Sequence, residues 1–426
     1  MATINRVIIG ESGGPTPVID WEVAGALAAA QKHDVSLYGA MNGLEGVLHA
    51  STNGNIIDLS QLDPMQFVHN GPGAGLSTTR IKPTEAQYVT MAENLDRLGI
   101  EGVVYIGGND SADQLRGLTR VNSQLAAIHA IKTVDNDLPE THHSPGWGSA
   151  ALFNATALKH VESDFSGYGV TGNDEDGKES RLIAPVVIYQ VMGRKAGWLA
   201  HATAFARVDP RGEMVEGRAP HIILSKEVPF DKEAYLKLLE ETIQRYGKAT
   251  VVVQEDLTDK ATGQSLSEMY SKDSTDDHGN VQHGRATSFS TAIYLAQLAT
   301  SELKVSNVQT VKEAALVPQH IQRSFSMSIP DAAEAYMVGY AAMEALLAGE
   351  SGKSVILKRD THGGFTTDLT DLGNIAKKER QVPLEFIEGM RGPTQAFIRE
   401  YIGVIGGPVA LPHYSNIQRI AIPLRR

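Results

Sequence analysis

The chain has 426 residues, carries a formal net charge of -12 at pH 7 and contains no cysteine. Its length predicts two domains, the missing cysteines exclude disulfides and thiolate chemistry, and the acidic balance argues against nucleic-acid binding. Because no apolar run is long enough to cross a bilayer and the amino terminus enters a strand without a signal-like pattern, we expect a cytoplasmic protein with no membrane contact.

The first part of the chain, residues 1–145, alternates short apolar stretches with helical patterns. Predicted strands cover residues 4–10, 36–41, 102–108 and 126–134. Predicted helices cover residues 18–32 and 83–98, and a further helix begins near residue 112. Each strand leads into a polar or glycine-bearing turn, which is the pattern of consecutive βαβ units. We therefore predict a parallel sheet here.

The second part repeats this alternation less regularly. Predicted strands cover residues 185–191, 221–230, 250–256 and 354–359. Predicted helices cover residues 148–164, 198–205, 232–246, 287–303 and 331–347, and a helix-like segment and a basic tail follow the last strand. Two polar stretches, 172–180 and 258–285, are expected to be loops. These patterns predict the α/β class, with two similar layered halves and no short-period repeat.

A dense group of polar residues follows the predicted strand 126–134. Lys132, Thr133, Asp135 and Asp137 lie within six residues of one another. Two carboxylates this close at a strand end are costly unless a cation or a proton separates them. If the segment is extended, both point the same way, so that one can act as a base while the other holds a metal. The alternative is a capped turn ahead of Pro139.

Glycine turns follow two other predicted strands. Gly13–Gly14 and Gly107–Gly108 close these strands, and Asp110–Ser111 opens the helix that follows the second. The carboxyl ends of parallel strands meet at one edge of a sheet, where open α/β sheets bind their ligands. Phosphoryl transfer needs three kinds of group: glycines that allow the backbone to approach phosphate closely, carboxylates that bind a metal, and cations that stabilise the charge on the transferred group. The dinucleotide fingerprint and the P-loop are both absent.

Characteristic blocks of sequence run along nearly the whole chain: GGPTPVID (13–20), Arg80, GGNDS (107–111), KTVDND (132–137), SPGWGSA (144–150), MGRKAGW (192–198), EVPF (227–230), Glu255 and HIQRS (320–324). In this order they resemble the phosphofructokinase family, specifically its pyrophosphate-dependent bacterial branch. The resemblance implies an α/β fold of two Rossmann-like three-layer domains with the active site in the cleft between them. Residues 1–146 with about 322–375 are expected to bind the phosphate donor, and residues 147–321 with about 376–426 the sugar phosphate.

The resemblance also implies roles for individual residues. The implied catalytic groups are Asp135, Lys132 and Arg194, with Asp135 as the base that takes the proton of the sugar 1-hydroxyl. The implied sugar-phosphate ligands are Thr133, Asp137, Met192, Gly193, Glu255, His320 and Arg323. The implied donor ligands are Gly13, Gly14, Arg80, Gly108, Asp110 and Ser111. Asp110 and Asp137 are the implied ligands of the Mg²⁺ cofactor.

Two positions bear on the phosphate donor. By resemblance, ATP-dependent members carry glycine where this chain has Asp110 and Lys132. A carboxylate at position 110 fills and repels the space of a nucleotide α-phosphate, whereas Lys132 neutralises a compact pyrophosphate. We therefore predict reversible, Mg²⁺-dependent phosphorylation of D-fructose 6-phosphate at O1 by pyrophosphate, a step of glycolysis. An ATP-dependent 6-phosphofructokinase is the alternative.

Other positions depart from the family pattern. Asn109 replaces an aspartate and Gln190 replaces a glutamate. Pro185 and Ala314 stand where members extend arginines across a subunit interface to the sugar 6-phosphate, and Lys312 is a candidate to replace them. These departures leave open a kinase of the same fold that acts on another ketose with a different 6-substituent.

An alternative of another class is a noncatalytic relative that binds a sugar phosphate without turnover. Retention of the catalytic carboxylates and of Arg194 argues against it. The expected partners are pyrophosphate and a sugar phosphate, with no nucleic acid and no membrane, and the resemblance implies a homodimer or homotetramer.

Overall fold

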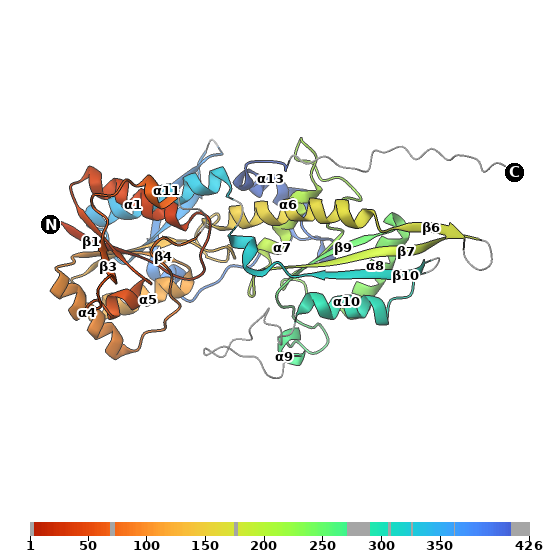
Figure 1. The fold of residues 1–426 in the computed structure, drawn as a ribbon, viewed down its shortest axis with the longest axis horizontal. Helices are drawn as coiled ribbons and strands as arrows, with labels where there is room; N and C mark the ends of the chain where they lie inside the picture. Colours follow the sequence, from red (N-terminus) through yellow and green to blue (C-terminus); the bar gives the residue numbers. More distant parts are fainter. Residues whose placement is uncertain are drawn as a thin grey trace.

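The computed structural model describes residues 4–68, 73–173, 178–270, 290–305, 308–324, 327–361 and 363–409. These residues fold into two lobes that lie next to each other along the longest axis of the molecule (Figure 1). One lobe is built on a seven-stranded sheet and the other on a five-stranded sheet. Among the described helices, none is long and apolar enough to cross a membrane.

The seven-stranded sheet has the order β12-β11-β5-β4-β1-β2-β3. Its strands are β1 (Arg6–Glu11), β2 (Ser36–Ala40), β3 (Ile56–Asp58), β4 (Gly102–Gly107), β5 (Ala126–Ile131), β11 (Lys353–Arg359) and β12 (Phe365–Asp371). The inner strands run parallel, and β3 and β12 pair antiparallel at the two edges. The inner strands are covered on both faces, which explains why β1, β4 and β5 are continuous apolar runs.

The helices of this lobe are α1 (Ile19–Lys32), α2 (Leu44–Leu48), α3 (Met65–Val68), α4 (Glu85–Leu98), α5 (Asn109–Val121), α11 (Ile329–Leu347) and α12 (Leu372–Ile375). Helices α1 and α11 pack side by side (Figure 1). Glycines permit this close contact. A Cβ atom on Gly25 would lie 2.1 Å from the carbonyl oxygen of Tyr336, and one on Gly339 would lie 1.9 Å from that of Glu22.

The second lobe contains β6 (Val170–Asn173), β7 (Glu179–Val191), β8 (Ile222–Leu224), β9 (Ala249–Gln254) and β10 (Val308–Leu316). The sheet order is β10-β7-β9-β8, all parallel, and β6 pairs antiparallel with β7. The accompanying helices are α6 (Trp147–Ser166), α7 (Trp198–Ala202), α8 (Lys232–Tyr246), α9 (Leu266–Tyr270), α10 (Thr291–Ser301) and α13 (Gln395–Tyr401). Short 3-10 helices are η1 (Thr203–Arg207), η2 (Gln319–Arg323), η3 (Leu384–Phe386), η4 (Gly389–Arg391) and η5 (Ile402–Ile405).

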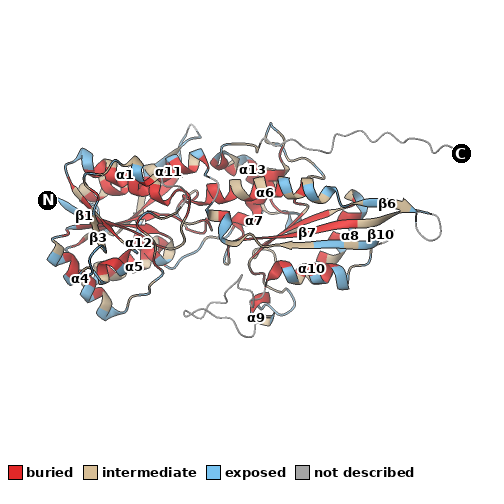
Figure 2. Ribbon diagram, viewed as in Figure 1, coloured by how far each residue is buried: buried red, intermediate tan, exposed pale blue. Residues whose placement is uncertain are grey.

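Buried residues concentrate on the strands and on the helix faces that turn toward them (Figure 2). Near the junction of the lobes, aromatic rings from α6, α7 and α13 form one cluster. The ring centroids of Trp147 and Tyr401 are 5.5 Å apart, as are those of Trp198 and Tyr401. Each buried ring removes a large apolar area from water, so this cluster fixes the start of α6 against α13.

The predicted parallel strands are confirmed, but the prediction is wrong at the edges of both sheets. The segment after β11, expected to be helix-like, begins with strand β12, which pairs with one neighbour only, and its helices α12 and α13 follow that strand. The residues of β12 alternate between partly buried and exposed, so they lack the apolar run of an inner strand. The stretch 172–180, expected to be a loop, contributes to the β6–β7 hairpin, and residues 174–177 lie outside the described part.

Three other strands differ from the sequence prediction. Strand β10 was not predicted, because its exposed edge carries many polar residues. The strand expected over 221–230 covers only Ile222–Leu224, since the chain then turns and the Val228 amide donates to the Ser225 carbonyl at 3.1 Å. The strand expected over 126–134 ends at Ile131. Most of the polar stretch 258–285 lies outside the described residues.

Candidate active site

The segment after β5, Lys132–Asp137, is called here the carboxylate loop. Its first residue, Lys132, is only 2% exposed. The Lys132 Nζ donates to the carbonyl of Ser12 at 2.8 Å and to that of Gly14 at 2.7 Å. Gly13, between them, has a φ of +76°, a conformation that glycine adopts without steric cost. Lys132 therefore stabilises the glycine turn that follows β1.

Buried carboxyl groups lie close to this lysine. Burial lowers the pKa of Lys132 to about 8, and the nearby carboxylates of Glu22 and Glu11 oppose that shift. Glu22 is fully buried, and within the described residues neither of its carboxyl oxygens has a hydrogen-bond partner. Burial raises the pKa of Glu22 well above its usual value. The positive charge of Lys132 is therefore held in a desolvated environment, where electrostatic interactions are strong.

The carboxylate loop is not extended, which corrects the expectation that Asp135 and Asp137 alternate as in a strand. Asn136, between them, has a φ of +53°, in the left-handed region. Its side-chain oxygen accepts a hydrogen bond from the Ser144 amide at 3.0 Å, which holds this conformation. The Asp135 amide donates to the Thr133 hydroxyl at 3.1 Å. The loop thus presents Asp135 from a turn that is fixed at both ends.

The two carboxylates still influence each other. Asp137 is 7% exposed, and its burial together with the charge of Asp135 raises its pKa to about 7. Burial also raises the pKa of Asp135, while the positive charges of Arg194, Arg323 and Arg80 act in the opposite direction. Asp135 is therefore the centre of a group of cations drawn from distant parts of the chain.

Arg323, on η2, reaches the glycine turn of the other lobe. A Cβ atom on Gly14 would lie 2.0 Å from Arg323 Nη1, so the guanidinium rests directly on this glycine. The Arg323 Nη2 is 2.8 Å from His320 Nδ1. Burial and the charge of Arg323 lower the pKa of His320, which favours a neutral ring. The predicted sugar-phosphate residues His320 and Arg323 therefore lie beside the predicted donor residue Gly14.

The Met192-Gly193-Arg194 turn follows β7 and faces the carboxylate loop. The Met192 amide donates to the side chain of Gln322 at 3.1 Å, which attaches the turn to η2. Gly193 has a φ of +108°, and a Cβ atom on it would lie 3.9 Å from Asp135 Oδ1. At the end of β9, burial and the charge of Asp135 raise the pKa of Glu255 to about 7. Residues of both lobes thus converge on Asp135.

The remaining predicted donor residues lie at the start of α5. A Cβ atom on Gly108 would meet only the Lys132 carbonyl, at 3.9 Å, so the backbone is open to close approach here. Asp110 is exposed on the first turn of the helix. Ser111 is 4% exposed, and its hydroxyl is hydrogen-bonded to that of Ser12. The Ser111 side chain therefore connects α5 to the glycine turn.

The metal prediction rests on carboxylates alone. In the described parts of the chain, no group of three or more His, Asp or Glu side chains is arranged to hold a metal ion. The mutually repelling pair of partly buried Asp135 and buried Asp137 nevertheless has the chemistry of a cation site, because a hard divalent cation prefers carboxylate oxygens and relieves their repulsion. The assignment of Asp110 and Asp137 to Mg²⁺ stays a prediction.

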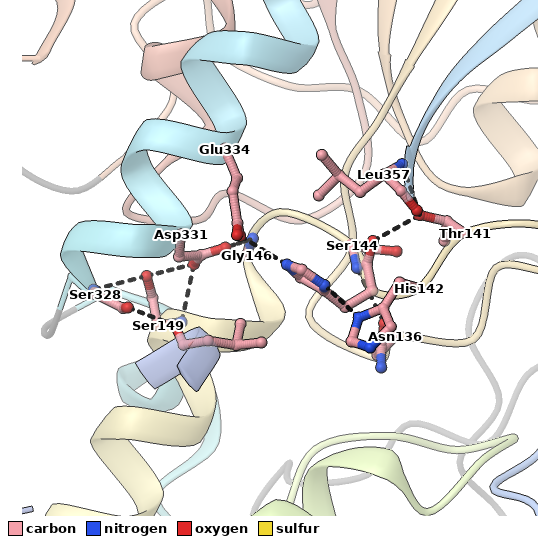
Figure 3. A network of polar contacts seen from close by, with 12 residues as sticks. Asn136, Thr141, His142, Ser144, Gly146, Ser149, Ser328, Asp331, Glu334 and Leu357 are labelled. Atoms are coloured by element: carbon pink, nitrogen blue, oxygen red, sulfur yellow. Dashed lines mark hydrogen bonds and ion pairs between the residues drawn. The ribbon is translucent and has the colours of Figure 1, made fainter. Parts of the chain in front are cut away.

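A network of polar contacts joins the carboxylate loop to α6 and α11 (Figure 3). Asp331 accepts hydrogen bonds from the amides of Gly146 and Ser149, at 2.9 and 2.8 Å, and so satisfies the start of α6. His143 is fully buried, and its Nε2 is 2.6 Å from the Glu334 carboxylate on α11. This network fixes the segment that leaves the carboxylate loop.

The two expected arginine positions lie on neighbouring strands. Pro185 on β7 is opposite Lys312 on β10, and Ala314 lies two residues further along β10. The Lys312 Nζ is 3.9 Å from the centre of the Tyr168 ring, which places its charge on an aromatic face. No arginine occupies either position in this chain.

Several residues with a part in the site were given no role from the sequence. Arg380 donates to carbonyls of the carboxylate loop, Glu227 accepts from the Gly197 amide, and Glu22 lies buried near Lys132. A charged residue within the apolar, alanine-rich pattern of α1 is a signal that can mark Glu22. Arg380 has no such signal, because the carbonyls to which its guanidinium donates lie more than two hundred residues away in sequence.

Comparisons with known proteins agree with this geometry. Residues 6–346 match the family described as Phosphofructokinase. A pyrophosphate--fructose 6-phosphate 1-phosphotransferase of Rhodospirillum rubrum is 31% identical over 393 residues, which cover 90% of this chain and 89% of the relative. A sulfofructose kinase of Alkalicoccus urumqiensis is 28% identical over 257 residues, covering 59% of this chain and 61% of the relative. The crystal structure of a pyrophosphate-dependent phosphofructokinase from Marinobacter aquaeolei superposes with a TM-score of 0.75 at 26% identity, over 99% of both chains.

Proposed function

This chain belongs to the phosphofructokinase family, and from that premise we propose that it transfers a phosphoryl group reversibly from pyrophosphate to O1 of D-fructose 6-phosphate. The products are fructose 1,6-bisphosphate and inorganic phosphate, and the reaction is a step of glycolysis in the cytoplasm. The observation that carries the proposal is the position of Asp135. It lies among Arg80, Arg194 and Arg323, and Arg323 in turn rests on Gly14 of the glycine turn.

In the proposed reaction, Asp135 accepts the proton of the 1-hydroxyl as O1 forms a bond to phosphorus. The bond from that phosphorus to the bridging oxygen of pyrophosphate breaks, and phosphate leaves. Arg194 and Lys132 stabilise the negative charge that spreads over the moving group. Positioning and charge stabilisation supply most of the rate enhancement in such transfers, so a cation-rich environment around one carboxylate is the arrangement expected.

The substrate ligands are proposed on the same basis. Thr133, Asp137, Met192, Gly193, Glu255, His320 and Arg323 would hold the sugar phosphate, and Gly13, Gly14, Arg80, Gly108, Asp110 and Ser111 the donor. Asp110 and Asp137 would hold Mg²⁺, which when bound neutralises charge on the phosphate oxygens. Two domains, 1–146 with about 322–375 and 147–321 with about 376–426, would each supply one side of the cleft, and the active assembly would be a homodimer or homotetramer.

A substrate panel tests the proposal. Purified protein with Mg²⁺ is assayed with pyrophosphate or ATP as donor and with fructose 6-phosphate as acceptor, and the bisphosphate formed is measured. We expect turnover with pyrophosphate and much slower turnover with ATP. Faster turnover with ATP would contradict the donor assignment, and binding of sugar phosphate without turnover with either donor would indicate a noncatalytic relative.

A second acceptor is favoured by a specific observation. Neither Pro185 nor Ala314 supplies a charge for a 6-phosphate, and Lys312 lies against Tyr168. A ketose whose 6-substituent is a monoanion needs fewer cations than a phosphate dianion does, and one relative carries the name sulfofructose kinase. The same panel, extended to 6-deoxy-6-sulfofructose, decides between this acceptor and fructose 6-phosphate by the ratio of their kcat/KM values.

A further inference from the structure

The segment Lys378–Val382, called here the strap, follows α12 and passes between the two lobes. Its contacts extend to three segments that carry or adjoin predicted site residues: the first turn of α5, the carboxylate loop and the turn after β7. On the donor side, the Asn109 side chain donates to the Lys378 carbonyl at 3.2 Å, directly before Asp110. The strap has no expected role in the chemistry, and its sequence belongs to none of the family motifs.

Its central residue, Arg380, holds the carboxylate loop. The Arg380 amide donates to the Asp137 carbonyl at 2.6 Å. The guanidinium donates to the Asn136 carbonyl at 3.1 Å, to the Asn136 side chain at 3.2 Å and to the His142 carbonyl at 3.1 Å. It also donates to the Thr141 carbonyl. Only a planar guanidinium offers this many donors in a fixed arrangement, so lysine cannot replace the set.

Arg380 also holds the helix that follows the Met-Gly-Arg turn. Its carbonyl accepts a hydrogen bond from Trp198 Nε1 at 3.0 Å. Its guanidinium carbon lies 4.3 Å from the centre of the Trp198 ring, in cation–π contact. The same side chain thus contacts the residue that begins α7 and the loop that presents Asp135.

Neighbouring strap residues bind the turn between Arg194 and α7. Glu379 forms an ion pair with Lys195, and the Gln381 side chain donates to the Lys195 carbonyl at 2.8 Å. Glu227, from the EVPF block, accepts hydrogen bonds from the Gly197 amide at 2.8 Å and from the Val382 amide at 3.1 Å. One carboxylate oxygen therefore joins the strap to this turn.

These contacts fix one distance, the separation between the carboxylate loop and the Met-Gly-Arg turn. The loop continues from a strand of one sheet and the turn from a strand of the other. Without a connection, the two would move independently with their lobes. Misplacing reacting groups by about 1 Å can reduce a rate by roughly 100-fold, so the connection has a direct consequence for catalysis.

We propose that Arg380 is a positioning residue. Together with Glu227, it holds the carboxylate loop and the Met-Gly-Arg turn at a fixed separation without touching the substrate. The inference deepens the proposed function and rests on it for its kinetic consequence. Its structural part, the mutual ordering of the two loops, does not depend on which donor or acceptor is used.

The matched variants are Arg380→Lys and Arg207→Lys. Arg207 is a suitable control because it is also partly buried, donates to the carbonyl of Arg391 at 2.8 Å and lies away from the two loops. Burial lowers the pKa of both arginines to about 10. Two readouts are used: hydrogen exchange across residues 135–144 and 192–198, and the steady-state constants of the full-length protein with Mg²⁺ and the substrate pair that the panel identifies.

In Arg380→Lys, we expect faster exchange in both segments and a kcat about 100-fold lower, with KM for the sugar phosphate little changed. Arg207→Lys should leave both segments and kcat unchanged. Should Arg380→Lys fail to fold, a comparison of Glu227→Ala with Glu227→Gln replaces it. The amide oxygen of glutamine still accepts both hydrogen bonds, so only the alanine variant should show the effect. Unchanged exchange in the two segments, or a normal kcat accompanied only by a lower melting temperature, would overturn the proposal. If the wild-type protein shows no turnover, the proposed function fails and the exchange data alone decide the inference.

Discussion

At the scale of single residues, Asp135 and Lys132 occupy opposite electrostatic situations. Burial raises the pKa of Asp135 and lowers the pKa of Lys132, so both pKa values move toward neutral pH. The charged form of Asp135 is stabilised by the surrounding arginines and by Lys132. The charged form of Lys132 is stabilised by Glu22 and Glu11, whereas Arg323 and Arg80 oppose it. A buried group keeps a charge only when such partners are present, and functional sites are the usual place for this arrangement.

Replacing Asp135 by asparagine tests the base directly. The side chain keeps its shape but cannot take up the proton of the sugar hydroxyl, so we expect kcat to fall by about 100- to 10,000-fold. Binding of fructose 6-phosphate, measured by calorimetry, should persist, because the arginines remain. A variant that retains near-normal turnover would show that another group accepts the proton.

The pH dependence of donor use follows from Lys132. Its pKa in the folded protein is about 8, so the ammonium is charged below that pH and loses its charge as the pH rises through it. Pyrophosphate needs this charge, and we therefore expect kcat/KM for pyrophosphate to decline above pH about 8. The pH profile of the wild type is compared with that of Lys132→Met. We expect kcat/KM for pyrophosphate in this variant to be lower and independent of pH over this range. A decline that persists in Lys132→Met would assign it to another group.

At the scale of elements, close contact between backbones determines where glycine is required. Gly14 is covered by the guanidinium of Arg323, whereas Gly25 and Gly339 are covered by main-chain atoms of the facing helix. A flexible side chain can move away from an added methyl group, but a helix backbone cannot. The two kinds of glycine are therefore expected to respond differently to alanine.

Gly14→Ala should displace Arg323 from the glycine turn without unfolding the protein. The lost contacts of a charged group are worth about 1.5–3 kcal/mol, so we expect kcat/KM to fall by roughly 10- to 100-fold. The melting temperature should stay near that of the wild type. A variant with unchanged kinetics would mean that Arg323 has no role at this turn.

Gly339→Ala, in contrast, should lower the stability of the fold. The added Cβ atom would lie 1.9 Å from the Glu22 carbonyl oxygen, so α1 and α11 must separate. Overpacking of this kind costs about 1–3 kcal/mol in the free energy of unfolding, measured by denaturant titration. Gly373→Ala, where a Cβ atom meets nothing within 4 Å, is the control. Equal stability of the two variants would contradict the close helix contact.

Which strands were predictable depends on whether both of their faces are covered. β1, β4 and β5 are apolar because both faces are covered, so their sequences identify them. β12 and β10 lie at sheet edges and carry mixed patterns, and neither was predicted as a strand. The left-handed Asn136 was also missed, since its conformation depends on hydrogen bonds to Ser144 and Arg380.

At the scale of the whole molecule, the candidate site is assembled from both sheets. The carboxylate loop follows β5, the Met-Gly-Arg turn follows β7, and Arg323 reaches from η2 to the turn after β1. The contiguous motifs made the residue types of this site predictable. The strap was not predictable, because its function lies in contacts between segments that are distant in sequence.

The most direct test of the central claim is a phosphorus NMR spectrum of the wild-type protein with Mg²⁺, pyrophosphate and fructose 6-phosphate. We predict a sugar 1-phosphate signal and inorganic phosphate that increase in equal amounts while pyrophosphate disappears. Adding fructose 1,6-bisphosphate and phosphate should regenerate pyrophosphate through the same site. Hydrolysis of pyrophosphate to phosphate without a sugar 1-phosphate signal, or no change in the spectrum, would contradict the account.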